Sequence, residues 1–346
     1  MSANLVIHKV EFSVFGKGYD DDRGNSGTGV VDEEITLQAY SAAIDSTGTY
    51  AWIVTGSGLK KYRMSDWTVV ASDISGACRG VFHPCNTSNN YGLALIQNGS
   101  ACDAYIFNLT DDTIYATIST PITHTSGDLI DWECVLISGK IYLLNRHWGS
   151  NANSRLMTFD IEDETYDQSV VIGGVGCNGF INDSLIFAEY TREWFYQTST
   201  AYAFNFSGSA VWSNTGIDNN SNLSPWGFTG NGYLYLPVKI DGTWHWGVFS
   251  GASNPTFQPV LPIRYFGTYS SAPSLAPYIA GNNRNMYITY TDGKTKGCAL
   301  TSLGVIYTDF TDAVIIADKT IAPLAMNDDV VLCSDYANNK LYVIGL

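Results

Sequence analysis

Two short stretches of the sequence combine tryptophan with charged side chains, at residues 146–148 and 192–194. Exposed Trp and Arg side chains anchor protein interfaces, and aromatic rings also attract cations through their faces. An exposed indole ring can also stack on the face of a sugar ring. Binding, and not bond-making chemistry, is therefore what these residue types favour. The candidate binding residues are Arg146, His147, Trp148, Arg192, Glu193, Trp194 and Trp226.

Cysteine and histidine show no metal-ligand pattern. Cys78 and Cys85 flank His83, but two thiolates and one imidazole lack the fourth ligand and the spacing of a zinc site. The seven cysteines are odd in number and irregularly spaced, and most of them lie in apolar strand patterns. That usage is typical of buried free thiols in a protein made in a reducing cytoplasm. No metal site and no cofactor is predicted.

The charge of the 346-residue chain argues against nucleic acid and anionic membranes as partners. Eighteen basic residues face 33 acidic ones, for a formal net charge of -15. Nucleic-acid binding needs clustered Lys and Arg, and an anionic membrane surface would repel such a chain. No apolar run is long enough for a transmembrane helix, and residues 1–10 lack the layout of a signal peptide. We therefore expect no nucleic-acid partner, no membrane insertion and no export by a signal peptide.

The composition favours strands. The chain contains 22 Tyr, 15 Phe, 9 Trp and 33 Gly, while only 15% of its residues are charged. Aromatic residues suit half-buried pleated surfaces, and frequent glycine suits many short strands joined by tight turns. An all-β class follows.

A strongly apolar strand, preceded by a Gly, Asn or Asp turn, recurs at intervals of about 40–50 residues, which is the length of a four-stranded propeller blade. A third strand follows each copy, and a more variable fourth strand follows the first six, at Gln168–Ile172 in the third unit. The sequence therefore predicts a seven-bladed β-propeller of four-stranded antiparallel blades. The seven apolar strands begin at Tyr50, Tyr91, Ile141, Ser184, Tyr233, Met286 and Val330.

The last unit has only three strands before the sequence ends at Leu346. A ring with such a blade needs another strand at its open edge. The alternating segment Ile35–Tyr40 is unassigned, and we predict that it closes the ring as the outer strand of the last blade. The propeller then spans residues 34–346. Residues 1–33 form an N-terminal extension or docking arm, whose strand Leu5–Phe15 pairs with another subunit or folds back on the rim.

The predicted fold brings the Trp-containing stretches together. In a propeller, connections between second and third strands share one face of the disc with the loops between blades. The long connections Asn145–Ser154 and Tyr190–Thr198 belong to neighbouring blades, so the candidate binding residues form one patch on that face. The alternative is that Trp148 and Trp194 fold over the blade edge as packing.

Glycoside hydrolases with propeller folds are the main enzymatic alternative. Asp241-Gly242-Thr243-Trp244 resembles the end of the Asp-box turn of sialidases, but the full pattern is missing. Five-bladed glycosidases place paired carboxylates on inner strands. Here the predicted inner strands, such as Gly80-Val81-Phe82 and Cys134-Val135-Leu136, carry no acid in their middle. We therefore expect a protein that is not an enzyme, with a sialidase-like lectin or hydrolase as the alternative.

The blade count and the polar surface rich in Asn, Ser, Gly and Tyr resemble propeller modules of phage tails, loosely and over residues 34–346. The resemblance implies a non-catalytic structural or adhesive part of a bacteriophage particle, such as a tail, collar or adhesin component. It would be made in the host cytoplasm and located in the virion. Its partners would be other virion proteins, in a homo- or hetero-oligomeric assembly, and a host-surface glycan at the Trp148/Trp194 patch. An intracellular WD40 or kelch scaffold ranks last, because those repeat signatures do not recur.

Overall fold

The computed structural model describes 18 segments of the chain, and the elements in them are β-strands. The predicted all-β class is confirmed. Among the described residues, no helix is long and apolar enough to cross a membrane. The described segments are 31–84, 89–123, 129–146, 154–172, 176–181, 185–190, 200–214, 228–230, 233–240, 243–250, 257–262, 279–281, 285–289, 295–300, 306–307, 322–327, 330–335 and 338–345.

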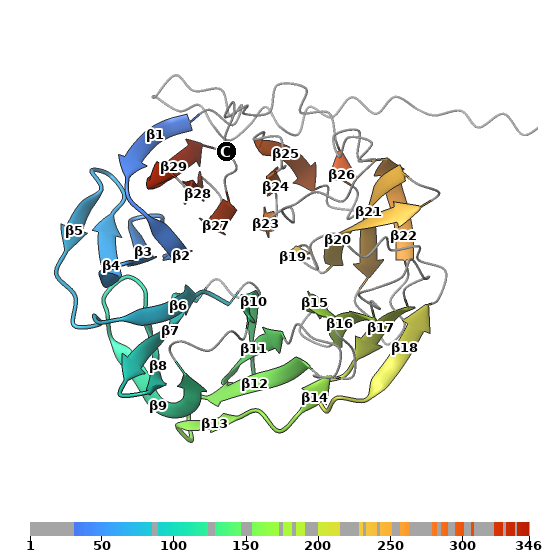
Figure 1. Ribbon diagram of the computed structural model, residues 1–346, viewed down its shortest axis with the longest axis horizontal. Helices are drawn as coiled ribbons and strands as arrows, with labels where there is room; N and C mark the ends of the chain where they lie inside the picture. Colours follow the sequence, from blue (N-terminus) through green and yellow to red (C-terminus); the bar gives the residue numbers. More distant parts are fainter. Residues whose placement is uncertain are drawn as a thin grey trace, which may run out of the picture.

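The described strands form seven antiparallel sheets, numbered here in chain order (Figure 1). Sheet 1 contains β2 (Ala39–Ile44), β3 (Tyr50–Thr55), β4 (Gly58–Arg63) and β5 (Thr68–Val70). Sheet 2 contains β6 (Cys78–Phe82), β7 (Tyr91–Asn98), β8 (Ala101–Asn108) and β9 (Ile114–Thr123). Sheet 3 contains β10 (Leu129–Ile137), β11 (Lys140–Arg146), β12 (Ser154–Asp160), β13 (Thr165–Asp167) and β14 (Val171–Ile172).

The remaining sheets repeat this order of strands. Sheet 4 contains β15 (Gly176–Ile181), β16 (Leu185–Tyr190), β17 (Thr200–Phe204) and β18 (Ala210–Asn214). Sheet 5 contains β19 (Phe228–Gly230), β20 (Tyr233–Ile240), β21 (Thr243–Ser250) and β22 (Phe257–Pro262). Sheet 6 contains β23 (Ile279–Gly281), β24 (Asn285–Thr289), β25 (Thr295–Leu300) and β26 (Ile306–Tyr307). Sheet 7 contains β27 (Ala322–Met326), β28 (Val330–Asp335), β29 (Lys340–Gly345) and β1 (Val31–Thr36).

The sheets stand side by side around a common centre, with the first strand of each innermost (Figure 1). These inner strands contact one another in succession, from β2 through β6, β10, β15, β19 and β23 to β27, and β27 contacts β2. Hydrogen bonds join some neighbours: the Ser41 hydroxyl donates to the Val81 carbonyl at 2.9 Å, and the Ser334 hydroxyl donates to the Ala39 carbonyl at 2.8 Å. Successive sheets are thus held together close to the centre.

The hydrophobic core lies between neighbouring sheets. Trp52, Val54 and Phe107 are buried between sheets 1 and 2, while Leu143 and Phe159 are buried between sheets 2 and 3. A strand that packs on both faces must be apolar on both, which explains why the second strands read as continuous apolar runs.

The strand that pairs with β29 is Val31–Thr36, and not the expected Ile35–Tyr40. Ile35 lies opposite Leu341, and Lys340 forms a 2.7 Å ion pair with Glu34. Ala39 instead begins the inner strand β2 and is buried between sheets 7 and 1. The alternating segment Ile35–Tyr40 spans the end of β1 and the start of β2, so the alternation does not reveal where the chain passes from one sheet to the next. Residues 1–30, which include most of the predicted arm, lie outside the described residues.

The outer part of sheet 3 also differs from the expectation of a single strand at Gln168–Ile172. Two short strands, β13 and β14, pair separately with β12. The carboxylate of Asp167 accepts hydrogen bonds from both the backbone N–H and the hydroxyl of Ser169, each at 2.8 Å. This side-chain turn interrupts the pairing where a continuous strand was expected.

Candidate functional site

The predicted binding patch falls largely outside the described residues. Arg146 is the last residue of β11, where its backbone lies opposite Leu129. The patch at this end of the sheets therefore stays a prediction. The residues outside the described part of the chain are His147, Trp148, Arg192, Glu193, Trp194 and Trp226.

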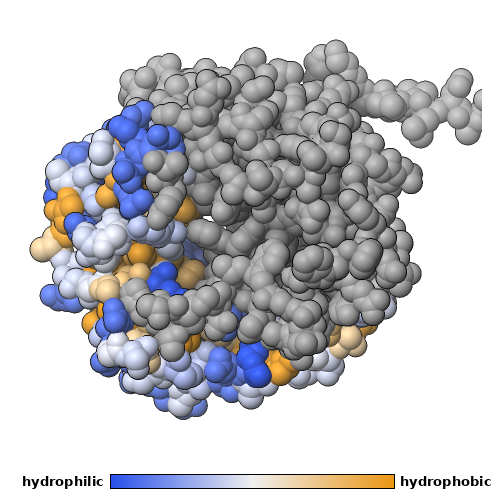
Figure 2. Space-filling model, viewed as in Figure 1, coloured by the Kyte–Doolittle hydropathy of each residue, from blue (hydrophilic) through white to orange (hydrophobic). Residues whose placement is uncertain are grey.

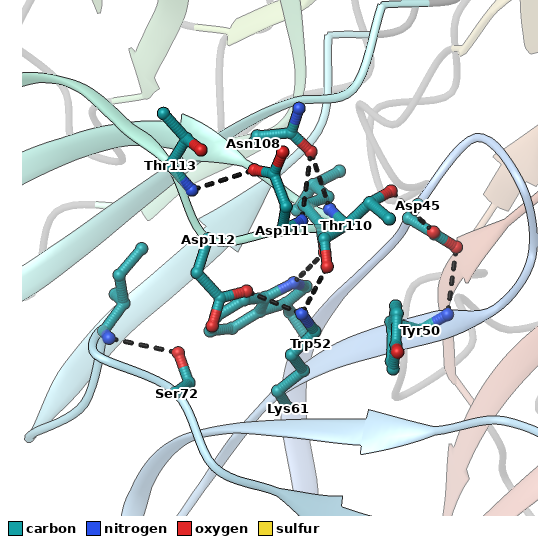
Figure 3. Close-up of polar contacts among 12 residues, drawn as sticks. Asp45, Tyr50, Trp52, Lys61, Ser72, Asn108, Thr110, Asp111, Asp112 and Thr113 are labelled. Atoms are coloured by element: carbon teal, nitrogen blue, oxygen red, sulfur yellow. Dashed lines mark hydrogen bonds and ion pairs between the residues drawn. The ribbon is translucent and has the colours of Figure 1, made fainter.

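The described residues that converge instead lie at the opposite end of the sheets, where turns join first to second and third to fourth strands. We call this end the hairpin face. Asp45 lies in the β2–β3 turn, and Thr110 and Asp112 lie in the β8–β9 turn. With Lys61 of β4 and Asn90, which precedes β7, they form a polar junction between sheets 1 and 2. Figure 3 shows four of the five meeting between the two sheets.

Asp45 is fully buried, and all of its acceptor capacity is used. One carboxylate oxygen accepts from the backbone N–H groups of Thr49 at 2.7 Å and Tyr50 at 3.0 Å. The other accepts from the hydroxyls of Thr47 at 2.7 Å and Thr110 at 2.8 Å. A buried carboxylate is tolerated only with such compensation. Asp45 therefore shapes its own turn and binds it to sheet 2.

Asn90, in the connection between β6 and β7, forms hydrogen bonds with the β2–β3 turn and the β8–β9 turn. Its side-chain oxygen accepts from the N–H of Ser46 at 2.6 Å, and its amide nitrogen donates to the Thr110 hydroxyl at 2.7 Å. Its backbone carbonyl accepts from the N–H of Leu109 at 2.9 Å. The three connections that meet here are thereby held in one arrangement.

Lys61 supplies the positive charge of the junction. Its side chain is only 5% exposed, and its ammonium donates to the Thr110 carbonyl at 2.5 Å and to the Asp112 carboxylate at 2.6 Å. The ammonium also lies 4.1 Å from the ring centroid of Tyr50, a distance that gives a cation–π attraction. Beneath it, the Trp52 indole N–H donates to the Leu109 carbonyl at 2.7 Å (Figure 3).

These contacts define what the polar junction can do chemically. The charges of Lys61 and Asp112 offset each other, and the oxygens of Asp45 are occupied by donors from this chain. A general base or nucleophile needs a free lone pair within reach of a substrate. The contacts of Asp45 and Lys61 therefore hold sheets 1 and 2 together.

His83 lies beside the polar junction, and its titration makes the stability of the folded protein depend on pH. Its Nδ1 is 2.8 Å from the Tyr91 carbonyl, which can only accept, so Nδ1 carries the proton. Burial lowers the pKa of His83 below its ordinary value, while the Tyr91 hydrogen bond and the nearby charge of Asp45 act in the opposite direction. The folded protein thus favours the neutral imidazole more strongly than the unfolded chain does.

We expect the free energy of unfolding to fall as the pH is lowered from 7 to 5. In this range the unfolded chain binds a proton at His83 that the folded protein resists, with a slope of at most about 1.4 kcal/mol per pH unit. Urea titrations of wild type and His83→Asn, which keeps a donor near Nδ1 but does not titrate, measure the difference. Hydrogen bonds lower the carboxyl pKas of Asp66, Asp111 and Asp160, so these groups stay ionised over the same range. Identical slopes in both proteins would contradict the assignment.

Four of the seven cysteines are structural. Cys78, Cys102, Cys134 and Cys333 are buried and free, which confirms the sequence prediction for these four. Burial raises the pKa of the Cys78 thiol to about 12 and shifts Cys102 and Cys333 in the same direction, so these thiols stay protonated. In the described part of the chain, no three His, Cys, Asp or Glu side chains are placed to hold a metal ion. Cys85 lies outside it.

The sequence pattern marks Asp45–Gly48 only as one of the turns that precede the apolar strands, and it singles out no residue of the polar junction. One local signal was available. An Asp followed closely by Thr residues forms side-chain turns that accept backbone N–H groups. The partners from sheet 2 are more than 40 residues away in sequence, so no spacing rule could have identified them.

Comparisons with known proteins show which fold the chain has, and nothing about its function. No protein-family model matches the chain, and no curated protein matches it. The uncharacterized protein lmo1340 from Listeria monocytogenes EGD-e superposes with a TM-score of 0.55 at 11% identity, covering 89% of this chain and 94% of that one. The β-propeller domain of Cps50 (Swd1) from Myceliophteria thermophila gives 0.54 at 8% identity, covering 91% and 100%. A chain of a mitotic checkpoint complex gives 0.55 at 10% identity, covering 95% of each.

These likenesses identify the fold. The chain is a β-propeller-type protein built from four-stranded antiparallel sheets. At such low identity they carry nothing about ligand, partner or activity.

Proposed function

We propose that the chain is a closed seven-bladed β-propeller that serves as a non-catalytic binding scaffold. The succession of inner-strand contacts from β2 to β27 and back to β2 supports seven blades around one axis. The pairing of β1 with β29 supports closure, because it joins the strand before the first blade to the last blade. Closure in this way protects sheet edges that would otherwise pair with other chains.

Two truncations test the closure. Removing residues 1–30 leaves β1 in place, and removing residues 1–36 deletes it. We expect the shorter deletion to leave the thermal midpoint unchanged within a few degrees. The longer one exposes the edge of β29 and the cores of sheets 7 and 1, so the midpoint should fall by about ten degrees, a loss of roughly 7 kcal/mol for a chain of this length. Equal midpoints would argue against a closing strand.

The observation that supports a scaffold function is that the charged side chains of the polar junction are bound by groups of this chain. Where charged side chains of neighbouring sheets meet in the described residues, they bind each other and fix the turns of the hairpin face. Such joints give a rigid disc on which surface loops can hold a partner. The stretches at 146–148 and 192–194 supply Trp and Arg of the kind that anchor such contacts.

We propose further that this scaffold is a component of a bacteriophage particle. The acidic charge, the polar and aromatic composition and the predicted N-terminal docking arm support it. Mass spectrometry of gradient-purified phage particles tests it directly. Peptides of this chain should accompany the tail proteins in constant ratio. A chain that stays in the soluble fraction, free of particles, would refute the virion assignment.

The alternative is a sialidase-like lectin or glycoside hydrolase, which the Trp residues of the predicted patch keep open. A glycan array with wild type, Trp148→Ala and Trp194→Ala separates the cases, with Arg63→Ala as an exposed control on sheet 1. Sugar binding that is lost in both Trp variants and kept in the control favours the lectin. Turnover of a fluorogenic sialoside would overturn the non-catalytic proposal.

A further inference from the structure

One exposed turn of the described residues carries two neighbours that can react with each other. Hydrophilic and hydrophobic residues are otherwise intermixed over the described part of the face in Figure 2, as is typical of a solvated surface. Asn98 ends β7, and Gly99 follows it in the turn to β8, at the end of sheet 2 opposite the hairpin face (Figure 1). Both residues are exposed, so water reaches them.

The amide nitrogen of Gly99 is open on the side of Asn98. Gly99 has φ +64°, and a Cβ there would meet nothing within 4 Å. Among the described residues, no group accepts a hydrogen bond from its N–H. The side chains of the turn bind other atoms: Gln97 Nε2 donates to the Gly99 carbonyl at 3.0 Å, and Asn98 Nδ2 donates to the Asp103 carboxylate at 2.7 Å. Because glycine has no side chain, its nitrogen can approach the side-chain carbonyl carbon of Asn98 closely.

We propose that Asn98 is a site of spontaneous deamidation. The Gly99 nitrogen gives up its proton and forms a bond to Cγ of Asn98. The bond from Cγ to Nδ2 breaks, so ammonia leaves with that proton and a cyclic imide remains. Water then opens the imide at one of its two carbonyls, which gives aspartate or isoaspartate. The first step joins groups on adjacent residues, and the only co-reactant of the sequence is water.

Asn108 shows how the same sheet blocks this reaction elsewhere. It precedes the β8–β9 turn, but the next residue, Leu109, is fully buried. The N–H of Leu109 donates to the Asn90 carbonyl at 2.9 Å. A nitrogen that is held in a hydrogen bond and screened by a leucine side chain is a poor nucleophile. Asn108 is therefore a control within the same molecule.

The products disturb the turn in two ways. Aspartate at position 98 places a carboxylate where the amide donates to Asp103, so an attractive contact becomes a repulsion between like charges. Isoaspartate also adds a methylene to the main chain, beside the last pair of β7 and β8, Asn98 with Ala101. Both changes should loosen the pairing at this end of sheet 2.

Peptide mapping of the full chain, incubated for several weeks at mildly alkaline pH, tests the proposal. We expect the peptide with Asn98 to gain the mass of an amide-to-acid conversion and to accept a methyl group from isoaspartyl methyltransferase. The peptide with Asn108 should stay unchanged. In Gly99→Ala a Cβ stands beside the nitrogen, so conversion of Asn98 should slow by about tenfold or more. The mapping separates this site from the other Asn-Gly pairs, Asn178-Gly179 and Asn231-Gly232.

Hydrogen exchange before and after the incubation gives a second readout. Amides of residues 97–103 should exchange faster in aged than in fresh wild type, while ageing should leave them unchanged in Gly99→Ala. Asn98→Asp should show part of the effect from the start, because it supplies the charge without isoaspartate. An Asn98 that stays intact in the folded protein but converts in the urea-unfolded chain would overturn the proposal, since the turn would then hold the nitrogen and Cγ apart. Equal rates at Asn98 and Asn108 would overturn it as well.

Discussion

Lys61→Met should lower the free energy of unfolding by about 3–5 kcal/mol, the cost of removing one partner from a buried ion pair. Methionine fills the space of the lysine chain but leaves the Asp112 carboxylate, 13% exposed, without a cation. The Thr110 carbonyl loses its 2.5 Å donor as well. Urea unfolding followed by tryptophan fluorescence measures the change, since the Trp52 ring centroid lies 5.5 Å from the Lys61 ammonium.

Two comparisons make this result diagnostic. Arg63→Met removes a cation from an ion pair with Asp66 in which both side chains are nearly half exposed, so it should cost less than about 1 kcal/mol. The double variant Lys61→Met/Asp112→Asn leaves no unpaired charge and should recover part of the lost stability. If Lys61→Met cost no more than Arg63→Met, the polar junction would not hold sheets 1 and 2 together.

Gly58→Ala should cost about 3 kcal/mol or more, through strain and collision combined. Gly58 has φ +106°, and a Cβ there would lie 2.3 Å from the carbonyl oxygen of Gly76. That carbonyl cannot move freely, because it accepts the N–H of Leu59 at 3.0 Å. The close approach fixes the loop from sheet 1 to sheet 2 against β4.

Gly99→Ala is the matched control for this prediction. Gly99 also has a positive φ, +64°, but a Cβ there would meet nothing within 4 Å. Only the backbone strain remains, which is worth about 1–2 kcal/mol. Both variants are compared by the same urea titration. Equal losses would mean that the contact with Gly76 relaxes without cost and that the loop is not fixed there.

The repeat could be predicted because each second strand is buried on both faces. Such strands read as short apolar runs after a turn, and those expected from Tyr50, Tyr91, Tyr233 and Val330 begin at those residues as β3, β7, β20 and β28. The pair Ser138-Gly139 likewise predicts a tight turn. It joins β10 to β11, and both residues have a positive φ. Local pattern and local geometry agree at these positions.

The contacts between sheets could not be predicted in the same way. The alternating segment Ile35–Tyr40 runs across the end of β1 and the start of β2, and only the pairing of β1 with β29 and the burial of β2 against sheet 7 separate the two strands. Lys61 reads as an ordinary exposed lysine in sequence. Its burial depends on the Thr110 carbonyl and the Asp112 carboxylate, which arrive from another sheet about 50 residues later. Such partners are set by tertiary packing.

The pairing of β1 with β29 has a consequence for biosynthesis. Thr36 and Lys340, which meet there, are 304 positions apart. At translation speeds of about 5–20 residues per second, β29 is synthesised on the order of 15–60 s after β1, and β1 stays unpaired for that time. During that time its edge is open to chaperones and to neighbouring nascent chains. Ribosomes that stall late in the message would therefore release a nearly complete chain that cannot protect its first strand.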